Sequence, residues 1–100
     1  MEAEYRAEII SNQSVEDDII ERLEKELPEI QYTLMNDVHG KGLTTKKLGS
    51  AAWPEQNFVL YAYVDKESAK KINEIMAAVK QKFPKEGISL FFTTCAKVEM

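Results

Sequence analysis

The chain has 100 residues, of which 44% are hydrophobic and 30% charged, and its formal net charge at pH 7 is -4. Residues 1–100 are enough for one domain and too few for two, and the composition is typical of a folded globular protein. The acidic balance argues against a nucleic-acid partner, because neutralising phosphates requires a basic surface. No apolar run approaches the roughly 18 residues of a membrane-spanning helix, and the first residues lack the basic start of a secretory signal. We therefore expect a cytoplasmic protein without membrane insertion.

The first half of the sequence predicts a strand, a helix and a second strand. Polar and apolar residues alternate from Glu4 to Ser11, which is the period of a half-buried strand. Ser14 and Asp17 resemble a capping box, and apolar residues then recur every fourth position until Pro28, which predicts an amphipathic helix. Alternation returns from Ile30 to Val38. One face of this second strand would carry Tyr32, Leu34 and Val38.

The second half repeats this order of elements. The apolar and aromatic run from Phe58 to Val64 predicts a central strand that is buried on both faces. Asp65 or Ser68 would cap a second helix, which ends near Pro84, and Ile88 to Ala96 would form a fourth strand. The predicted fold class is therefore α+β, a ferredoxin-like βαββαβ sandwich with a four-stranded antiparallel sheet and both helices on one face.

The second face of this sheet has a consequence for assembly, because the two helices cover only one face. Alternation places large uncharged side chains on the uncovered face, which soluble monomers seldom leave bare. We therefore predict a homo-oligomer; the alternative is that the loop between the two central strands folds back over this face. The residues concerned are Met35, Val59, Tyr61, Tyr63 and Phe91.

A long loop is predicted over residues 39–57, which hold three of the four glycines together with threonines and lysines. Glycine lets consecutive backbone N–H groups face an anion, and lysine adds positive charge. The segment matches neither a phosphate-binding P-loop nor a dinucleotide fingerprint. Two interpretations stay open, a site for a small anion or a plain solvated loop. Trp53 would anchor the return of the loop to the next strand. The candidate ligand-binding residues are Val38, His39, Gly40, Lys41, Gly42, Lys46 and Lys47.

Metal binding and catalysis have little support in the sequence. His39 is the only histidine and Cys95 the only cysteine. A zinc site needs three or four ligands, and a catalytic thiol needs a nearby base. A polar loop histidine and a structural cysteine are the favoured interpretations. We therefore predict no catalytic residues, no metal site and no enzymatic activity.

Two stretches, Asp37 to Gly42 and Leu48 to Pro54, resemble the PII nitrogen-regulatory superfamily, with the closest likeness to its uncharacterised PII-homologue branch. The resemblance implies a homotrimer whose sheets face the threefold axis. It also implies that residues 39–57 form the T-loop, which docks onto a target protein. Small-molecule effectors would bind in clefts between subunits. The function implied is a signalling protein that senses a small anionic effector.

Two departures from the PII pattern bear on the effector. The segment between the second helix and the fourth strand is only Phe83 to Ile88, without the glycine- and basic-rich stretch that holds ATP phosphates in typical members. No tyrosine lies between Val38 and Phe58, so the uridylylated tyrosine of some relatives has no counterpart. An adenine nucleotide or another small anion is the candidate ligand. The alternative is a trimeric metal-binding protein similar to the CutA family, using His39 or Cys95.

Overall fold

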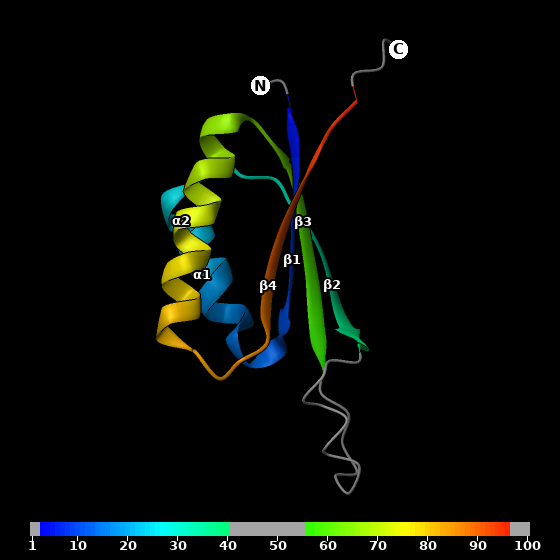
Figure 1. Ribbon diagram of the computed structural model, residues 1–100, viewed down its shortest axis with the longest axis vertical. Helices are drawn as coiled ribbons and strands as arrows, with labels where there is room; N and C mark the ends of the chain where they lie inside the picture. Colours follow the sequence, from blue (N-terminus) through cyan, green and yellow to red (C-terminus); the bar gives the residue numbers. More distant parts are fainter. Residues whose placement is uncertain (1–2, 41–55, 97–100) are drawn as a thin grey trace, which may run out of the picture.

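The computed structural model describes residues 3–40 and 56–96. Seven elements follow one another along this part of the chain (Figure 1). They are β1 (Tyr5–Asn12), the 3-10 turn η1 (Gln13–Val15), α1 (Glu16–Glu26), β2 (Thr33–Val38), β3 (Asn57–Val64), α2 (Lys66–Lys82) and β4 (Ile88–Thr94).

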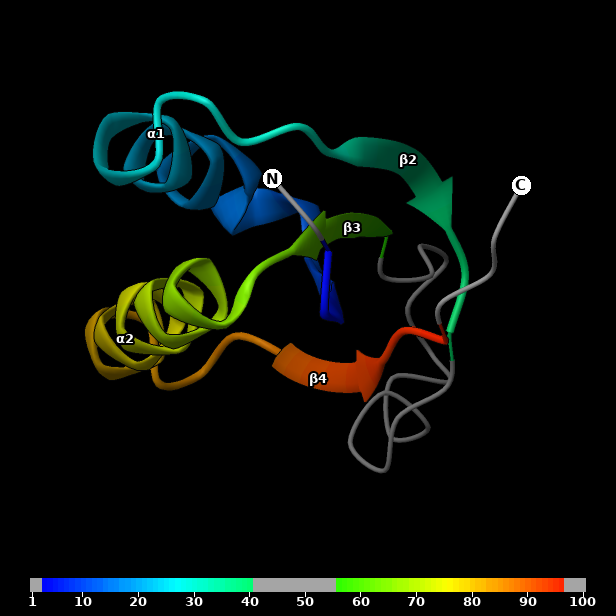
Figure 2. The same cartoon turned by 90° about the horizontal axis from the view of Figure 1, so that it is seen from above.

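The four strands form one antiparallel sheet in the order β2-β3-β1-β4. At the centre of the sheet Ile9 pairs with Leu60 on β3 and with Leu90 on β4. Seen from above, α1 and α2 lie together on one side of the sheet (Figure 2). The predicted ferredoxin-like α+β fold is therefore confirmed.

The hydrophobic core lies between the helices and the covered face of the sheet. Residues of β1 and β3 alternate strictly, so that every second side chain is buried against the helices. On α1 the buried residues recur at helical spacing, as the sequence predicted. Burying each large side chain contributes about 1.5–3 kcal/mol, so this layer accounts for much of the folding free energy. The largest buried hydrophobic side chains are Phe58, Ile9, Ile19, Leu23, Leu60, Ile72, Met76 and Val79.

The two helices begin in different ways. Asp65 caps α2 as predicted, since its Oδ1 accepts the Ser68 backbone N–H at 2.9 Å, and this hydrogen bond lowers the pKa of the Asp65 carboxyl. The predicted capping box of Ser14 and Asp17 is wrong. Asn12 Oδ1 instead accepts the Ser14 N–H at 2.9 Å and caps the short turn η1, which continues into α1 with Val15 at its N-cap position.

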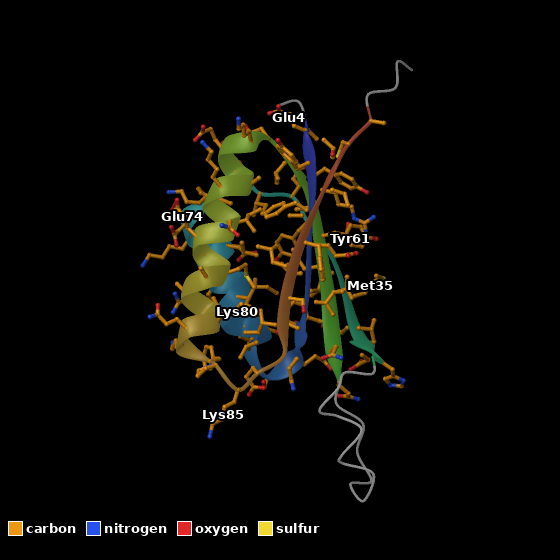
Figure 3. All side chains as sticks on the ribbon, in the orientation of Figure 1. Glu4, Met35, Tyr61, Glu74, Lys80 and Lys85 are labelled. Carbon is orange, nitrogen blue, oxygen red and sulfur yellow. The ribbon has the colours of Figure 1, made fainter. Side chains whose placement is uncertain are left out.

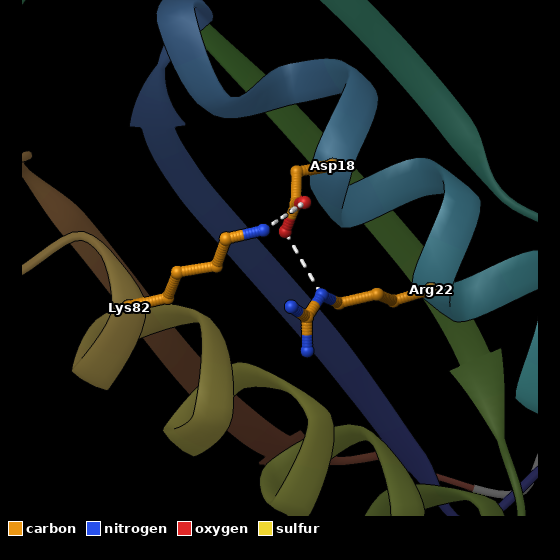
Figure 4. Close-up of polar contacts among 3 residues, drawn as sticks. All are labelled: Asp18, Arg22 and Lys82. Atoms are coloured by element: carbon orange, nitrogen blue, oxygen red, sulfur yellow. Dashed lines mark hydrogen bonds and ion pairs between the residues drawn. The ribbon is translucent and has the colours of Figure 1, made fainter.

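Acidic residues at the start of α1 favour the helix and also link it to α2. Glu16, Asp17 and Asp18 occupy its first turn, where negative charge complements the helix dipole. Asp18 accepts a hydrogen bond from Arg22 Nε at 2.9 Å and another from Lys82 Nζ at 3.3 Å (Figure 4). Lys82 lies in the last turn of α2. The second contact joins the end of one helix to the start of the other.

No helix in residues 3–40 and 56–96 has the length and apolar character needed to cross a membrane.

The second strand begins later than predicted, at Thr33 and not at Ile30. Leu27 ends α1, and its carbonyl oxygen accepts the Ile30 N–H at 2.9 Å, so residues 27–30 form a turn. Pro28 cannot continue the helix, which explains the turn at this position.

Candidate functional site

Three of the predicted ligand-binding residues lie in the described part of the chain, at the end of β2. Val38 is half-buried and pairs with Asn57, the first residue of β3. His39 and Gly40 follow it and are exposed. A Cβ placed on Gly40 would lie 3.4 Å from Asn57 Nδ2, so the backbone there runs close to β3. The other predicted residues lie outside the described residues: Lys41, Gly42, Lys46, Lys47 and the anchor Trp53.

A bulge in β2 sets the direction in which the chain enters this segment. The register with β3 shifts between Met35 and Val38, and Asp37 has a φ of 57°. This is the left-handed region, which Asp and Asn tolerate better than most residues. Because Val38 pairs with Asn57, the two residues share the face of the sheet that the helices do not cover. The prediction that Val38 lies on the same face as Leu34 is therefore wrong, since the bulge adds one residue and reverses the alternation.

The end of β2 lies at the same end of the sheet as the connection between α2 and β4 (Figure 1). The turn after β1 joins the two regions, because the Asn12 N–H donates to the Gly87 carbonyl and the Gln13 N–H donates to the Gln56 carbonyl, both at 3.0 Å. We call this region, made up of residues 12–13, 38–40, 56–57 and 83–87, the loop end of the sheet. Gln13 Oε1 is buried there and has no hydrogen-bond partner among the described residues.

The described lysines at and beside the loop end differ in their contacts. Lys85 is exposed in the α2–β4 connection (Figure 3). Lys82 already has partners within the chain, because its Nζ contacts Asp18 and lies 5.2 Å from the centre of the Phe83 ring. In the sequence Lys41, Lys46 and Lys47 lie between β2 and β3. Backbone N–H groups near a glycine, together with lysine side chains, are groups that bind small anions.

A cavity lies at the opposite end of the sheet, and the sequence did not predict it. This cavity of about 470 Å³ lies between the end of α1 and the start of α2, where its lining includes Leu27, Ile30 and Val64. Among the described residues its charged lining consists of Glu26, Glu29 and Asp65, with no lysine or arginine. Three carboxylates repel an anion, whereas the described loop end has one lysine and one carboxylate, Lys85 and Glu86, so the loop end suits the predicted ligand class better.

The uncovered face of the sheet carries the large uncharged side chains that the sequence predicted there. Met35, Tyr63 and Phe91 are 44%, 54% and 54% exposed. Figure 3 shows Met35 and Tyr61 projecting from the side of the sheet opposite the helices. The rings of Tyr61 and Tyr63 meet edge to face, with 6.5 Å between their centres. We call this surface the open face.

A contact on the open face was not predicted. The Arg6 guanidinium lies 4.5 Å from the centre of the Tyr61 ring, a cation–π contact between β1 and β3. Alternation along each strand puts Arg6 and Tyr61 on the same face, but only the strand order makes them neighbours.

The two residues considered for metal binding lie far apart. Cys95 follows β4 and its N–H donates to the Glu4 carbonyl beside the start of β1, whereas His39 lies near the end of β1. The eight residues of β1 span about 25 Å at roughly 3.3 Å per residue. Residues 3–40 and 56–96 contain no group of three or more His, Cys, Asp or Glu side chains that could hold a metal ion.

No protein-family model matches the sequence, and no curated protein matches it significantly. The comparison with solved structures, in contrast, finds chains that share this fold. A protein of the DUF3240 family from Shewanella baltica superposes with a TM-score of 0.69 at 14% identity, over 100% of this chain and 98% of the other. A PII-like protein of Thermus thermophilus gives a TM-score of 0.63 at 22% identity, over 92% and 86% of the two chains.

A third structure was determined with ligands. CPII, a nitrogen regulatory PII-like protein from Thiomonas intermedia, was crystallised with ADP, AMP and bicarbonate bound. It superposes with a TM-score of 0.61 at 15% identity, over 98% of both chains. The sheet order and helix placement define a ferredoxin-like α+β protein. More particularly, the chain shares its fold with PII-like proteins, so the resemblance seen in the sequence is confirmed at the level of the fold.

Proposed function

We propose that the protein is a PII-like regulator, and not an enzyme, that binds a small anion at the loop end of the sheet. The binding clefts would lie between the subunits of a homotrimer, and residues 39–57 would act on a target protein. The observation that carries the proposal is the juxtaposition of the loop end with the uncovered open face. A ligand at the loop end would thus lie beside the surface through which copies of the chain associate.

The ligand class follows from chemistry and from similarity of fold. Glycine backbone and lysine side chains favour an anion, and the PII-like protein CPII binds adenine nucleotides and bicarbonate. The α2–β4 connection offers only Lys85 as a described cation. The lysines of residues 41–47 would therefore carry more of the binding than they do in a typical member of the superfamily.

Calorimetry and thermal-shift measurements with ADP, AMP, ATP, bicarbonate and 2-oxoglutarate test this proposal. We expect at least one of these anions to raise the melting temperature. The double variant Lys46→Ala/Lys47→Ala should weaken binding of that anion. Lys70→Ala/Lys71→Ala removes the same charge from exposed positions on α2, near the opposite end of the sheet, and should leave binding unchanged. If no anion binds at millimolar concentration, or if both double variants behave alike, the proposed site is wrong.

A further inference from the structure

The open face carries one pair of opposite charges at its centre. Arg6 and Glu8 lie on the middle strand β1 and form an ion pair, with 3.1 Å between Arg6 Nη2 and Glu8 Oε2. The neighbouring strands place only uncharged side chains on this face. Those of β3 are Asn57, Val59, Tyr61 and Tyr63, and those of β4 are Ser89, Phe91 and Thr93.

The Arg6 side chain is held in place by contacts within its own chain, but not all of its hydrogen-bond donors are paired. Glu8 contacts one terminal nitrogen, and the Tyr61 ring lies 4.5 Å from the guanidinium carbon. Arg6 Nε is buried and has no hydrogen-bond partner among the described residues. A guanidinium has five N–H donors, and a buried donor without an acceptor destabilises the structure that contains it. In a single copy, the Arg6 guanidinium is therefore an oriented cation with unpaired hydrogen-bond donors.

The environment of this pair would change on assembly. The Arg6 and Glu8 side chains are 36% and 33% exposed, and at such exposure an ion pair contributes little to stability. A second molecule covering the open face would exclude the remaining water from both groups. The pair would then need further hydrogen bonds to offset the loss of hydration.

We propose that Arg6 of each copy donates hydrogen bonds to Glu8 of the neighbouring copy, while it stays packed on its own Tyr61. This inference rests on the proposed homotrimer and names the polar contact that fixes its geometry. Every copy has one donor group and one acceptor group, so each can give one contact and receive one, and a closed ring satisfies all of them.

The charges of the open face favour a second copy of the chain as the occupant. The whole chain has a net charge of -4, so two copies repel each other over most of their surfaces. The open face of β1 has one positive and one negative group and is therefore neutral and complementary to itself. A partner with a single sign of charge would attract one member of the Arg6–Glu8 pair and repel the other, so it would gain little from this face, whereas a second copy offers both signs.

A mixing experiment separates contacts within one copy from contacts between copies. Arg6→Glu leaves only negative charge at these two positions, and Glu8→Arg leaves only positive charge. Each variant alone should assemble with an apparent dissociation constant raised on the order of a hundredfold, because like charges then meet in the interface. Mixing the two variants should restore assembly in part, because a ring of three copies drawn from two variants has two interfaces in which arginines face glutamates and one in which like charges still meet. Sedimentation velocity at micromolar concentration measures all three samples beside the wild type.

Two further variants make the outcome specific. Lys80→Glu reverses a charge at an exposed position on α2 (Figure 3) and should assemble as the wild type does. Arg6→Lys keeps the charge but removes the planar pair of terminal nitrogens, and it should weaken assembly while the circular dichroism spectrum stays that of a folded protein. It also replaces the mixing test if either reversed variant fails to fold.

The possible failures can be told apart. A monomeric wild type would overturn both the homotrimer and the proposed contact. A wild type that assembles, with a mixture no more assembled than its separate variants, would overturn the contact alone. Wild-type affinity in Arg6→Lys would refute the role of the terminal guanidinium nitrogens. Anion binding at the loop end is measured separately, so its loss or retention bears on the proposed function.

Discussion

Truncating Phe91 to alanine should weaken self-association much more than it weakens the fold. Phe91 lies on β4 opposite Glu8 of β1, on the open face. Its ring is one of the large hydrophobic groups that the described chain leaves exposed. If another copy covers this face, the exposed part of the ring becomes buried only on assembly. The substitution therefore removes more interface area than core area.

The size of the effect follows from the exposed fraction of Phe91. A phenylalanine side chain buries about 200 Å² when fully covered, and the residue is 54% exposed. About 100 Å² per copy would thus be lost from the interface, which at about 25 cal/mol per Å² is about 2.5 kcal/mol. That energy corresponds to a roughly sixtyfold weaker association per copy at 25 °C.

Sedimentation equilibrium over a concentration series measures this change, and thermal unfolding checks that the variant still folds. Lys80→Ala alters an exposed side chain on the outer surface of α2 and provides the control. Equal association of Phe91→Ala and wild type would refute the argument that the open face is an interface. A purely monomeric wild type would do the same.

Three other substitutions test the fold and the loop end. Leu23→Ala empties a fully buried site between α1 and the sheet and should lower the free energy of unfolding by about 2–5 kcal/mol in urea titrations. Asp65→Asn should lower the melting temperature at neutral pH. The pKa of Asp65 in the folded state is lowered from its ordinary value of 3.8. Its contribution to stability is therefore present above that value and is lost as the pH falls through the lower folded-state pKa. The melting temperatures of the variant and the wild type should thus converge in acid. Gly40→Ala should fold normally, since among the described residues the new Cβ would meet the side-chain amide of Asn57 at 3.4 Å, an ordinary contact, and the φ of Gly40 is not positive. A large loss of stability in Gly40→Ala would show that the backbone there is more constrained than the structure indicates.

Most of the fold could be predicted from the sequence because local pattern and tertiary structure agree. The run from Phe58 to Val64 forms the predicted central strand, although only one of its two faces is buried in the single chain. The errors occur where local signals compete. Asn12 and Ser14 are both good capping residues, and the short turn η1 lets Asn12 cap first. The bulge at Asp37 places Val38 on the opposite face from the one predicted, because a period-2 pattern does not reveal an added residue.

The candidate site was less predictable than the fold, because it depends on which distant segments become neighbours. The glycines and lysines after β2 indicated an anion site, but the sequence does not show that Gln56, before β3, meets the turn at Gln13, or that this turn meets Gly87. The contact between Arg6 and Tyr61 required the strand order. The acidic cavity at the far end likewise arises from the meeting of two helix ends.

The bulge in β2 connects the two surfaces on which the proposed function depends. By adding a residue at Asp37, it turns Val38 onto the open face next to Asn57, while His39 and Gly40 continue into the loop end. A neighbouring copy that covers the open face would therefore lie against the residue from which the loop departs. Any ligand that changes the path of the chain at His39 or Gly40 would act on the edge of that interface, and a change in assembly would act on the ligand site in return. We therefore expect anion affinity and self-association to be coupled, so that Phe91→Ala lowers both, whereas Lys46→Ala/Lys47→Ala lowers anion affinity and leaves the association of the ligand-free protein unchanged.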